Sequence, residues 1–213
     1  MSVFITFEGP DGSGKSTQIQ LISDYLKQSG YQIYLTREPG GTSIGDQIRQ
    51  VLHDVHNTEM TARAEILLYS ASRAQLVEQE ILPRLKQGHV VLCDRYADST
   101  YAYQGYGRGL NFDNLRMITR FATQSLKPDL TIYLDLPVEE GLQRKEKANS
   151  AGRGEWNRMD RLKVDFHQRV RAGYLEMAQA EPERWLVVNA MASVEGIYQT
   201  ICQRLDKVIA LNS

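Results

Sequence analysis

A glycine-rich segment near the amino terminus constrains the fold more than any other feature of this sequence. The segment Gly9–Thr17 reads GPDGSGKST and matches GxxxxGK[ST]. It lies between an apolar run and a helical pattern, as the P-loop motif requires. Backbone N–H groups in such a loop point at phosphate oxygens, and the following helix N-terminus and Lys15 add positive charge. The predicted phosphate-binding residues are Gly9, Pro10, Asp11, Gly12, Ser13, Gly14, Lys15, Ser16 and Thr17, with Ser16 as a ligand of Mg²⁺.

Short apolar runs alternate with helical patterns along the chain. The runs are Val3–Phe7, Gln32–Thr36, His89–Asp94, Leu130–Asp135 and Trp185–Asn189. Because they are almost continuously apolar, both faces of these strands should be buried, as in a parallel sheet. We therefore expect an α/β P-loop NTPase fold, with a five-stranded parallel sheet flanked by helices on both faces. The predicted helices are Lys15–Ser29, Ile44–His53, Ala62–Gln87 with a break near Pro83, Asn111–Ser125, Val138–Lys147, Asp160–Ala180 and Val194–Leu211.

Length and composition indicate one ordinary domain. The 213 residues can form one well-packed core, and 42% hydrophobic residues exclude a disordered chain. Lys and Arg total 25 against 26 for Asp and Glu, so no basic excess points to nucleic acid or to a membrane surface. No apolar stretch approaches the roughly 18 residues of a membrane helix. Cys93 and Cys202 form no CxxC pair, so we expect free thiols and a cytoplasmic protein.

A second anion site is indicated where the second strand ends. Arg37 and Glu38 precede Pro39-Gly40-Gly41, at the carboxyl edge where open α/β sheets bind ligands, and Arg49 follows on the next helix. A Pro-Gly-Gly sequence is also ordinary turn chemistry, so this segment could serve only as a turn.

Two further patterns suggest a bound nucleotide. Tyr69 and Arg73 are four residues apart on one helix face and suit a nucleobase, although a core tyrosine beside a surface arginine has the same spacing. Directly after the third strand, Asp94 could hold metal-bound water and Arg95 could stabilise a transferring phosphoryl group. A structural ion pair is the alternative for these two residues.

The segment 143–161 is rich in basic residues and contains Gly152 and Gly154. Such a segment is either a solvated loop or a mobile lid over an anionic ligand. The P-loop itself leaves the reaction open, because switches, motors, ATPases and small-molecule kinases share it. No Asn-Lys-x-Asp sequence is present to bind guanine, which weakens the case for a GTPase.

Together these motifs resemble the thymidylate kinase family, in its bacterial type with glycine in the P-loop and arginine in the lid. The matching segments are the P-loop, Arg37–Gly41, Tyr69 with Arg73–Gln75, Asp94–Tyr96, Ser99-Thr100, Tyr103–Gly105 and Pro128–Asp135. The resemblance runs from about Val3 to Tyr174. It implies transfer of the γ-phosphoryl group of ATP to dTMP with Mg²⁺, giving dTDP for dTTP biosynthesis. It also implies a single nucleoside monophosphate kinase domain spanning residues 1–213 and a homodimer packed through helices.

The resemblance also implies roles on the acceptor side. Arg37 and Arg95 would hold the acceptor phosphate, with Glu38 positioning solvent or metal nearby, and Asp11 would contact the sugar hydroxyl or the metal region. The implied substrate-binding residues are Asp11, Arg37, Glu38, Pro39, Arg49, Tyr69, Arg73, Arg95, Ser99, Thr100, Tyr103 and Gln104.

Within this set, Tyr69 would stack on thymine, while Arg73 and Thr100 would contact its polar edge with help from Gln104. Tyr103 would crowd the 2′ position of the sugar, so that a ribose fits poorly. The implied catalytic residues are Lys15, Arg95, Asp94 and Arg153, and the implied metal-binding residues are Ser16 and Asp94.

Gly12 stands where other members of the family carry a basic residue in the P-loop. The resemblance therefore implies that a lid arginine completes the site: Arg153 first, because glycines flank it, then Arg158 and Arg144. Two alternatives to a dTMP kinase stay open at this point. One is another P-loop kinase, such as a deoxynucleoside kinase, and the other is a non-catalytic NTP-binding module.

Overall fold

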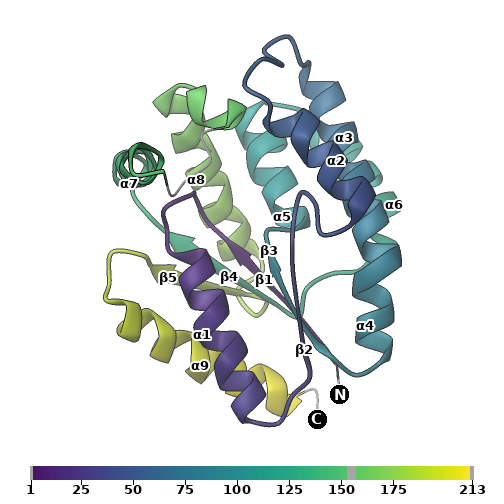
Figure 1. The fold of residues 1–213 in the computed structure, drawn as a ribbon, viewed down its shortest axis with the longest axis vertical. Helices are drawn as coiled ribbons and strands as arrows, with labels where there is room; N and C mark the ends of the chain where they lie inside the picture. Colours follow the sequence, from purple (N-terminus) through teal and green to yellow (C-terminus); the bar gives the residue numbers. More distant parts are fainter. Residues whose placement is uncertain (1, 153–156, 212–213) are drawn as a thin grey trace.

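Five parallel strands form one sheet in the computed structural model, which describes residues 2–152 and 157–211 (Figure 1). The strands are β1 (Val3–Glu8), β2 (Ile33–Arg37), β3 (Val90–Asp94), β4 (Leu130–Asp135) and β5 (Trp185–Asn189). Their spatial order is β2-β3-β1-β4-β5, and every neighbouring pair is parallel. The predicted α/β fold with helices on both faces is confirmed.

Helices and helical turns connect the strands. In chain order they are α1 (Lys15–Gln28), α2 (Ser43–His53), α3 (Ala62–Leu76), η1 (Val77–Ile81), α4 (Leu82–Lys86), α5 (Ala97–Thr100), η2 (Tyr101–Gly107), α6 (Phe112–Thr123), α7 (Val138–Ser150), η3 (Arg158–Arg161), α8 (Val164–Ala180) and α9 (Val194–Leu211). Helices α2 and α6 each begin one residue from the predicted start, at a position that a capping side chain determines. Thr42 accepts from the N–H of Gly45 to begin α2, and Asn111 accepts from Asp113 and Asn114 to begin α6.

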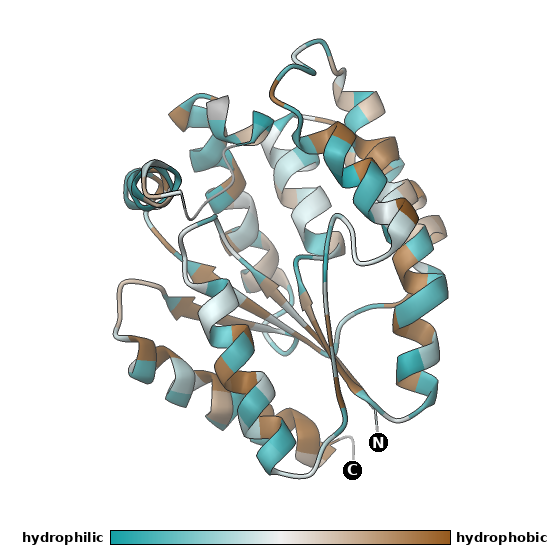
Figure 2. Ribbon diagram, viewed as in Figure 1, coloured by the Kyte–Doolittle hydropathy of each residue, from teal (hydrophilic) through white to brown (hydrophobic). Residues whose placement is uncertain are grey.

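Alternate residues of β1 pack on opposite faces of the sheet. Val3, Ile5 and Phe7 join the core that α1 and α9 cover. Phe4 instead packs with residues of α3 and η1, and Tyr133 of β4 packs on α8 on the same side of the sheet. Figure 2 shows the apolar residues concentrated on the strands and on the helix faces turned toward them. Burial on both faces explains why the inner strands β1, β3 and β4 are continuously apolar. The edge strands β2 and β5 depart from the expectation, because Leu35 is 40% and Val187 is 44% exposed.

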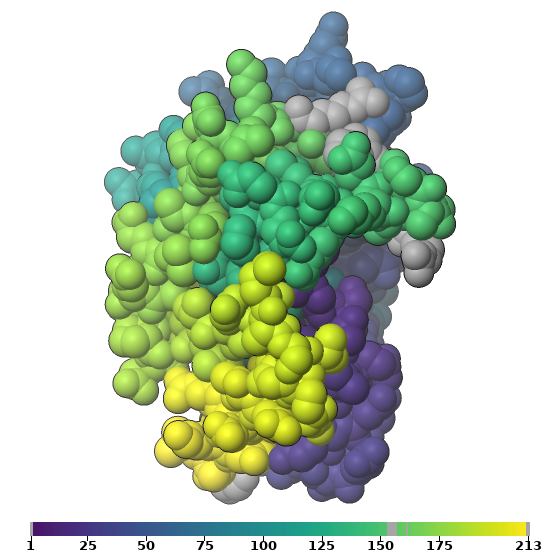
Figure 3. All heavy atoms as spheres, turned by 90° about the vertical axis from the view of Figure 1, so that its left-hand side faces the viewer, coloured from purple at the N-terminus to yellow at the C-terminus, as the bar shows by residue number. Residues whose placement is uncertain are grey.

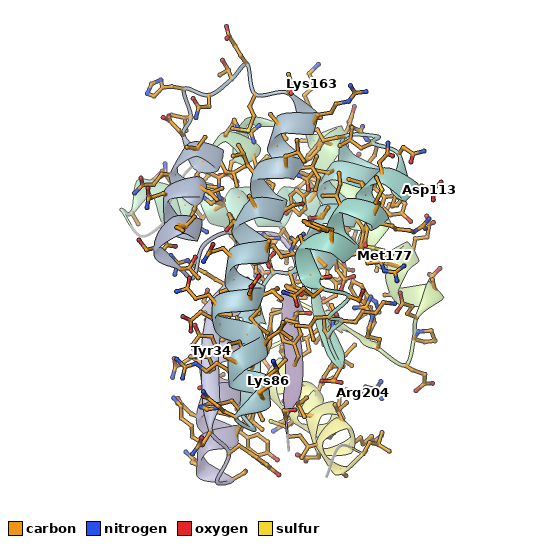
Figure 4. All side chains as sticks on the ribbon, turned by 90° about the vertical axis from the view of Figure 1, so that its right-hand side faces the viewer. Tyr34, Lys86, Asp113, Lys163, Met177 and Arg204 are labelled. Carbon is orange, nitrogen blue, oxygen red and sulfur yellow. The ribbon has the colours of Figure 1, made fainter. Side chains whose placement is uncertain are left out.

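The long helix after α2 does not break at Pro83. It continues from α3 through η1, a π-helical turn, into α4, where Pro83 lies in the first turn. Figure 4 shows this helix running on to Lys86. Proline lacks the N–H that an α-helix needs, and the wider π-helical turn just before Pro83 accommodates the missing bond. The predicted break is therefore a local change of helix type.

The predicted helix Asp160–Ala180 is also divided. The residues Arg158–Arg161 form the 3-10 turn η3, which a capping box between Asn157 and Asp160 closes, and α8 begins only at Val164. The polar capping side chains favour a short turn at this point.

The register of the strands brings the predicted site segments to one edge. Phe7 of β1 lies opposite Asp94 of β3, and Asp94 lies opposite Arg37 of β2. The P-loop, Asp94-Arg95 and Arg37-Glu38 therefore leave three neighbouring strands at the same level, which is the carboxyl edge where such sheets bind ligands.

Two smaller observations concern the rest of the chain. Cys93 is buried, Cys202 is partly buried, and both are free thiols, as predicted. Among the described residues, no helix is long and apolar enough to span a membrane.

Candidate active site

The P-loop has the backbone that a phosphate cradle requires. Gly9, Gly12 and Gly14 have φ values of 140°, 80° and 91°, which side-chain-bearing residues rarely adopt. Lys15 begins α1, and its Nζ donates to the carbonyl oxygens of Gly9 at 3.0 Å and of Pro10 at 3.2 Å. The amino end of α1 and a buried lysine therefore lie at the loop, and both favour an anion.

A cavity of about 570 Å³ opens above the carboxyl edge of the sheet. It reaches from the P-loop to the helix α3 and is lined by almost the whole predicted site. The predicted residues on its wall are Pro10, Asp11, Gly12, Gly14, Lys15, Ser16, Thr17, Arg37, Glu38, Pro39, Arg49, Tyr69, Arg73, Asp94, Arg95, Ser99, Thr100, Tyr103 and Gln104. Gly9 and Ser13 are buried beneath the loop, and Arg153 lies outside the described residues. The residues predicted for the P-loop and those predicted for a second bound nucleotide therefore line one cavity.

Asp94 and Ser16 meet the requirements for a magnesium site. The Oδ1 atom of Asp94 is buried with no hydrogen-bond partner among the described residues and lies 3.9 Å from Lys15 Nζ. The residue Ser16 is in the first turn of α1 and lines the same cavity. Mg²⁺ prefers oxygen ligands and usually completes its shell with water and phosphate oxygens. An unpartnered carboxylate oxygen beside the P-loop fits that chemistry.

Arg95 lies between the P-loop and the acceptor side of the cavity. Its backbone has φ of 68°, and its Nη2 atom donates to Asp11 Oδ1 at 2.9 Å. The guanidinium lies over the ring of Tyr103, 5.3 Å from the ring centroid. Within the described chain, its buried Nη1 atom has no hydrogen-bond partner. A strained, partly buried arginine with one unused donor can bind a phosphate oxygen.

Arg73 is buried in a tight polar cluster. Its Nε donates to Glu38 at 2.8 Å, its Nη1 donates to Thr100 at 2.9 Å, and its Nη2 donates to the carbonyl of Tyr96 at 3.2 Å. Burial raises the pKa of Glu38, and the Arg73 guanidinium opposes that rise. Arg73 and Thr100 are thus brought together as expected. Glu38 is bound to Arg73 through Oε2, and its buried Oε1 has no hydrogen-bond partner among the described residues.

The other two predicted acceptor arginines stand at the rim. Arg37 is about half exposed and pairs with Asp46 at 3.1 Å. Arg49 donates from Nη1 to the carbonyl of Pro39 at 3.1 Å. Both line the cavity, and Arg49 is held close to the turn that carries Arg37. The Pro-Gly-Gly sequence therefore makes a turn and positions these cations as well.

Glu65 is a central residue that the sequence analysis missed. Its carboxylate is fully buried and accepts from Gln104 at 2.8 Å, from Arg108 at 2.9 Å and from Arg158 at 2.6 Å. The spacing contains a signal, because Glu65 lies four residues before Tyr69 on the same helix face. Its position links α3 to η2 and to η3.

Glu8 was also missed, although it directly precedes the P-loop. Its buried carboxylate accepts from the N–H of Tyr96 at 2.9 Å, from Ser99 Oγ at 2.6 Å and from Tyr174 OH at 2.7 Å. Burial raises the pKa of Glu8 to about 7, against the opposing effect of Arg95. Glu8 therefore fixes the segment that directly follows Arg95 and ties it to Tyr174 of α8.

The described lid arginines occupy different places. Arg158 is buried, paired with Glu65 and bonded to the carbonyl of Leu52. Arg144 pairs with Glu140 at 2.6 Å and points its Nη1 at the carbonyl of Gly12, 3.4 Å away. Figure 3 shows α7 as a green arm projecting over the purple amino-terminal segment. Arg144 is therefore the nearer of these two to the P-loop, whereas Arg158 is bound to Glu65 of α3.

Comparison with known proteins agrees with this geometry. A family model described as thymidylate kinase matches residues 7–201. This chain belongs to the thymidylate kinase family. Thymidylate kinase from Roseiflexus sp. strain RS-1 is 52% identical, with 99% of this chain and 96% of that protein covered. Thymidylate kinase from Geotalea daltonii is 50% identical, with 92% of each covered.

A solved structure gives the same result. The crystal structure of thymidylate kinase from Ehrlichia chaffeensis superposes with a TM-score of 0.76 at 31% identity, covering 96% of this chain and 98% of that one. The chain is therefore an enzyme, a kinase of the thymidylate kinase family that phosphorylates thymidylate. A non-catalytic NTP-binding module and another type of P-loop kinase are not favoured.

We expect Glu8→Gln to change how stability depends on pH. Because the folded protein raises the pKa of Glu8 from 4.5 to about 7, this group supports folding most below about pH 4.5, and its support is lost as pH rises through 7. The variant should gain unfolding free energy relative to wild type between pH 5 and 8, by up to ~3 kcal/mol, while turnover falls. Urea unfolding at both pH values measures the difference.

The exposed carboxylate Glu146 on α7 provides the matched control. Glu146→Gln should track the wild type at both pH values. A stability difference between Glu8→Gln and wild type that is the same at pH 5 and pH 8 would contradict the expectation.

Proposed function

We propose that this enzyme transfers the γ-phosphoryl group of ATP to the 5′-phosphate of dTMP, giving dTDP for dTTP biosynthesis. The observation that carries the proposal is that Arg95 is bonded to Asp11 of the P-loop and lines the same cavity as Tyr69 and Arg73. A donor seated on the P-loop and an acceptor base beside Tyr69 would meet at this arginine. We further propose one domain, residues 1–213, with a lid at about 143–161, and a cytoplasmic location.

On the donor side, the P-loop amides and Lys15 would hold the β- and γ-phosphates of ATP. Ser16 and Asp94 would hold Mg²⁺, and when bound the metal neutralises charge on the phosphate oxygens. The unpartnered oxygen of Asp94 supports this assignment. Lys15 lies 3.9 Å from that oxygen, so lysine and carboxylate orient each other before a nucleotide arrives.

On the acceptor side, Arg95 would bind the 5′-phosphate through its unused Nη1, with Arg37 and Arg49 adding positive charge at the rim. The base would stack on Tyr69. The donors of Arg73 are largely occupied by Glu38, Thr100 and Tyr96, so this side chain is held in one position beside the proposed place of the base.

The remaining acceptor contacts come from η2 and its approach. Tyr103 lies against Arg95 and would crowd the 2′ position of the sugar. Gln104 is held by Glu65 and Ser99 by Glu8, so both are fixed before the nucleotide binds. Pre-positioned groups of this kind lower the barrier by reducing the motion lost in the transition state.

The transfer itself asks little covalent chemistry of the protein. A phosphate monoester is already anionic near neutral pH, so no residue has to remove a proton from the acceptor. The chain must align the two phosphates and stabilise the charge that spreads over the transferring group. Lys15 and Arg95 both lie near Asp11 Oδ1, at 3.8 Å and 2.9 Å, and would supply that positive charge.

We also propose a homodimer formed through α3 and α6, which pack on each other. Large apolar side chains stand exposed on these helices: Leu67 is 57%, Met117 is 65% and Phe121 is 87% exposed. Figure 4 shows both helices on one side of the molecule, with α6 beginning near Asp113. Exposed apolar side chains gathered on one side are typical of an interface.

Phe121→Asp should convert this dimer to a monomer, because a carboxylate cannot be buried unpaired in an apolar interface. Sedimentation equilibrium measures the mass, with Val194→Asp on α9 as the control at another exposed apolar residue. A wild-type mass of 24.2 kDa, that of one chain, would exclude the homodimer.

Release of ADP from ATP should depend on dTMP and should be weaker with dUMP, with dCMP and thymidine poorest. Loss of the thymine methyl group is expected to cost about 1–3 kcal/mol, or roughly 10–200-fold in kcat/KM. A coupled ADP assay with the four acceptors measures this order. Equal rates with thymidine would indicate a nucleoside kinase, and hydrolysis indifferent to dTMP would indicate a binding module.

Arg95→Ala should lower kcat by at least about 100-fold, because the transition state loses a cation at the transferred group. The KM for ATP should change little, since ATP is held by the P-loop. Arg95→Lys keeps the charge without the planar fork and should recover only part of the rate. The control is Arg84→Ala, a half-exposed arginine paired with Glu80 near the far end of the sheet. Turnover of Arg95→Ala equal to that of Arg84→Ala would remove Arg95 from the mechanism.

A further inference from the structure

Lys145 is a buried lysine at the active-site cavity, and no sequence motif predicted a role for it. It lies on α7, its side chain is 8% exposed, and its Nζ contacts Asp11 Oδ2 and, at 2.6 Å, Asp160 Oδ2. Lysine is almost never buried unless it is paired. Here one ammonium group bridges two carboxylates from different segments, the P-loop and η3.

Both carboxylates also have other partners. Asp11 accepts from Arg95 at 2.9 Å and lies 3.8 Å from Lys15. Asp160 accepts from the N–H of Asn157 at 2.8 Å, the bond that closes the capping box of η3. A continuous chain of charges therefore runs from Arg95 through Asp11 and Lys145 to η3.

The order of charges in this chain makes Lys145 its central member. Although burial opposes ionisation, Arg95, Lys15 and Lys145 together hold the pKa of Asp11 well below its ordinary value. Burial raises the pKa of Asp160, Lys145 opposes that rise, and Asp11 adds to it. Without Lys145, Asp11 and Asp160 would lose the cation that both contact. Asp11 would keep Arg95 and Lys15, whereas Asp160 would keep the N–H of Asn157.

Close packing of α7 on the P-loop determines where Lys145 can reach. A Cβ atom on Gly12 would lie 3.0 Å from Arg144 Cβ, 3.2 Å from the Gly141 carbonyl oxygen and 3.7 Å from the backbone nitrogen of Lys145. The backbone of α7 therefore touches the P-loop directly at Gly12. Since the helix is held at this distance, the ammonium of Lys145 reaches Asp11 with little freedom left in its side chain.

We propose that Lys145 is a positioning residue for the acceptor nucleotide: it holds Asp11 against Arg95 and fixes η3 beside the cavity. The inference rests on the proposed function, because Asp11 and Arg95 are assigned there to the acceptor. Lys145 acts through these two side chains and through the place of η3. Its loss should affect dTMP before ATP, since ATP is held by the P-loop amides and Lys15.

The test compares Lys145→Gln with Lys147→Gln. Lys147 is exposed on the same helix and its substitution removes the same charge. Lys145→Gln should lower kcat/KM for dTMP by roughly 10- to 100-fold and raise the dissociation constant of dTMP in titration calorimetry, while KM for ATP stays within about twofold, in line with the loss of one buried charge contact. Lys145→Arg should recover part of the affinity, and Lys147→Gln should match the wild type.

Asp160→Asn distinguishes the contact of Lys145 with Asp160 from its contact with Asp11. It weakens the tie to η3 and leaves the Asp11 contact in place, so its loss of dTMP affinity should be smaller than that of Lys145→Gln. The double variant should be no worse than Lys145→Gln alone, because both changes interrupt one chain of contacts. If Lys145→Gln does not fold, Asp160→Asn carries the test alone, and wild-type affinity for dTMP in that variant overturns the proposal.

Other outcomes are equally decisive. Equal values for Lys145→Gln and Lys147→Gln overturn the positioning role. Equal losses for dTMP and ATP overturn it as well and indicate a residue that binds the transferring phosphate. The wild-type enzyme reports separately on the proposed function: if it and Lys147→Gln release no dTMP-dependent ADP, the function fails and the inference fails with it.

Discussion

Buried charge has to be paired, and this requirement organises the walls of the active-site cavity. Arg73 is bound to Glu38, Arg158 to Glu65, and Lys145 to both Asp11 and Asp160. Each pair joins different segments of the chain, so that moving one partner takes a contact with an opposite charge away from the other. Pairing therefore gives the site its shape as well as its charge.

These pairs can form only because the sheet is parallel and its strands end together. The register that places Phe7, Asp94 and Arg37 at one level brings the P-loop, the Arg95 loop and the acceptor turn to a common edge. Helices α3, α7 and α8 then enclose that edge from outside. Glycine completes the arrangement at Gly12, where any side chain would push α7 away from the P-loop.

The sequence predicted the strands well because their signal is local. β4 and β5 have the bounds that their apolar runs indicated, and the P-loop lies where its motif required. Most residues of the motifs line one cavity, since segments that follow neighbouring parallel strands must meet. Helix ends and the π-helical turn before Pro83 were missed because capping side chains and a missing proline N–H decide them locally, beyond what periodicity shows.

The partners of the site residues were beyond prediction for a different reason. Nothing in the order of residues states that Arg73 will meet Glu38, 35 positions away, or that Glu65 will accept from both Gln104 and Arg158. Lys145 looked like one more charge on a solvated helix until its neighbours were known. Periodicity identifies the face of a helix, whereas the partner of a buried charge depends on how the whole chain packs.

Pairing within the protein also governs how an anion would enter the cavity. Since Arg37 and Arg95 already hold Asp46 and Asp11, an arriving phosphate meets salt bridges rather than bare cations, and it has to exchange places with carboxylates or share their donors. With a formal net charge of −1, the molecule offers little long-range attraction. The attraction felt by a phosphate is therefore local, since it comes from cations on the cavity wall such as Lys15 and Arg95 and falls off within a Debye length of about 10 Å.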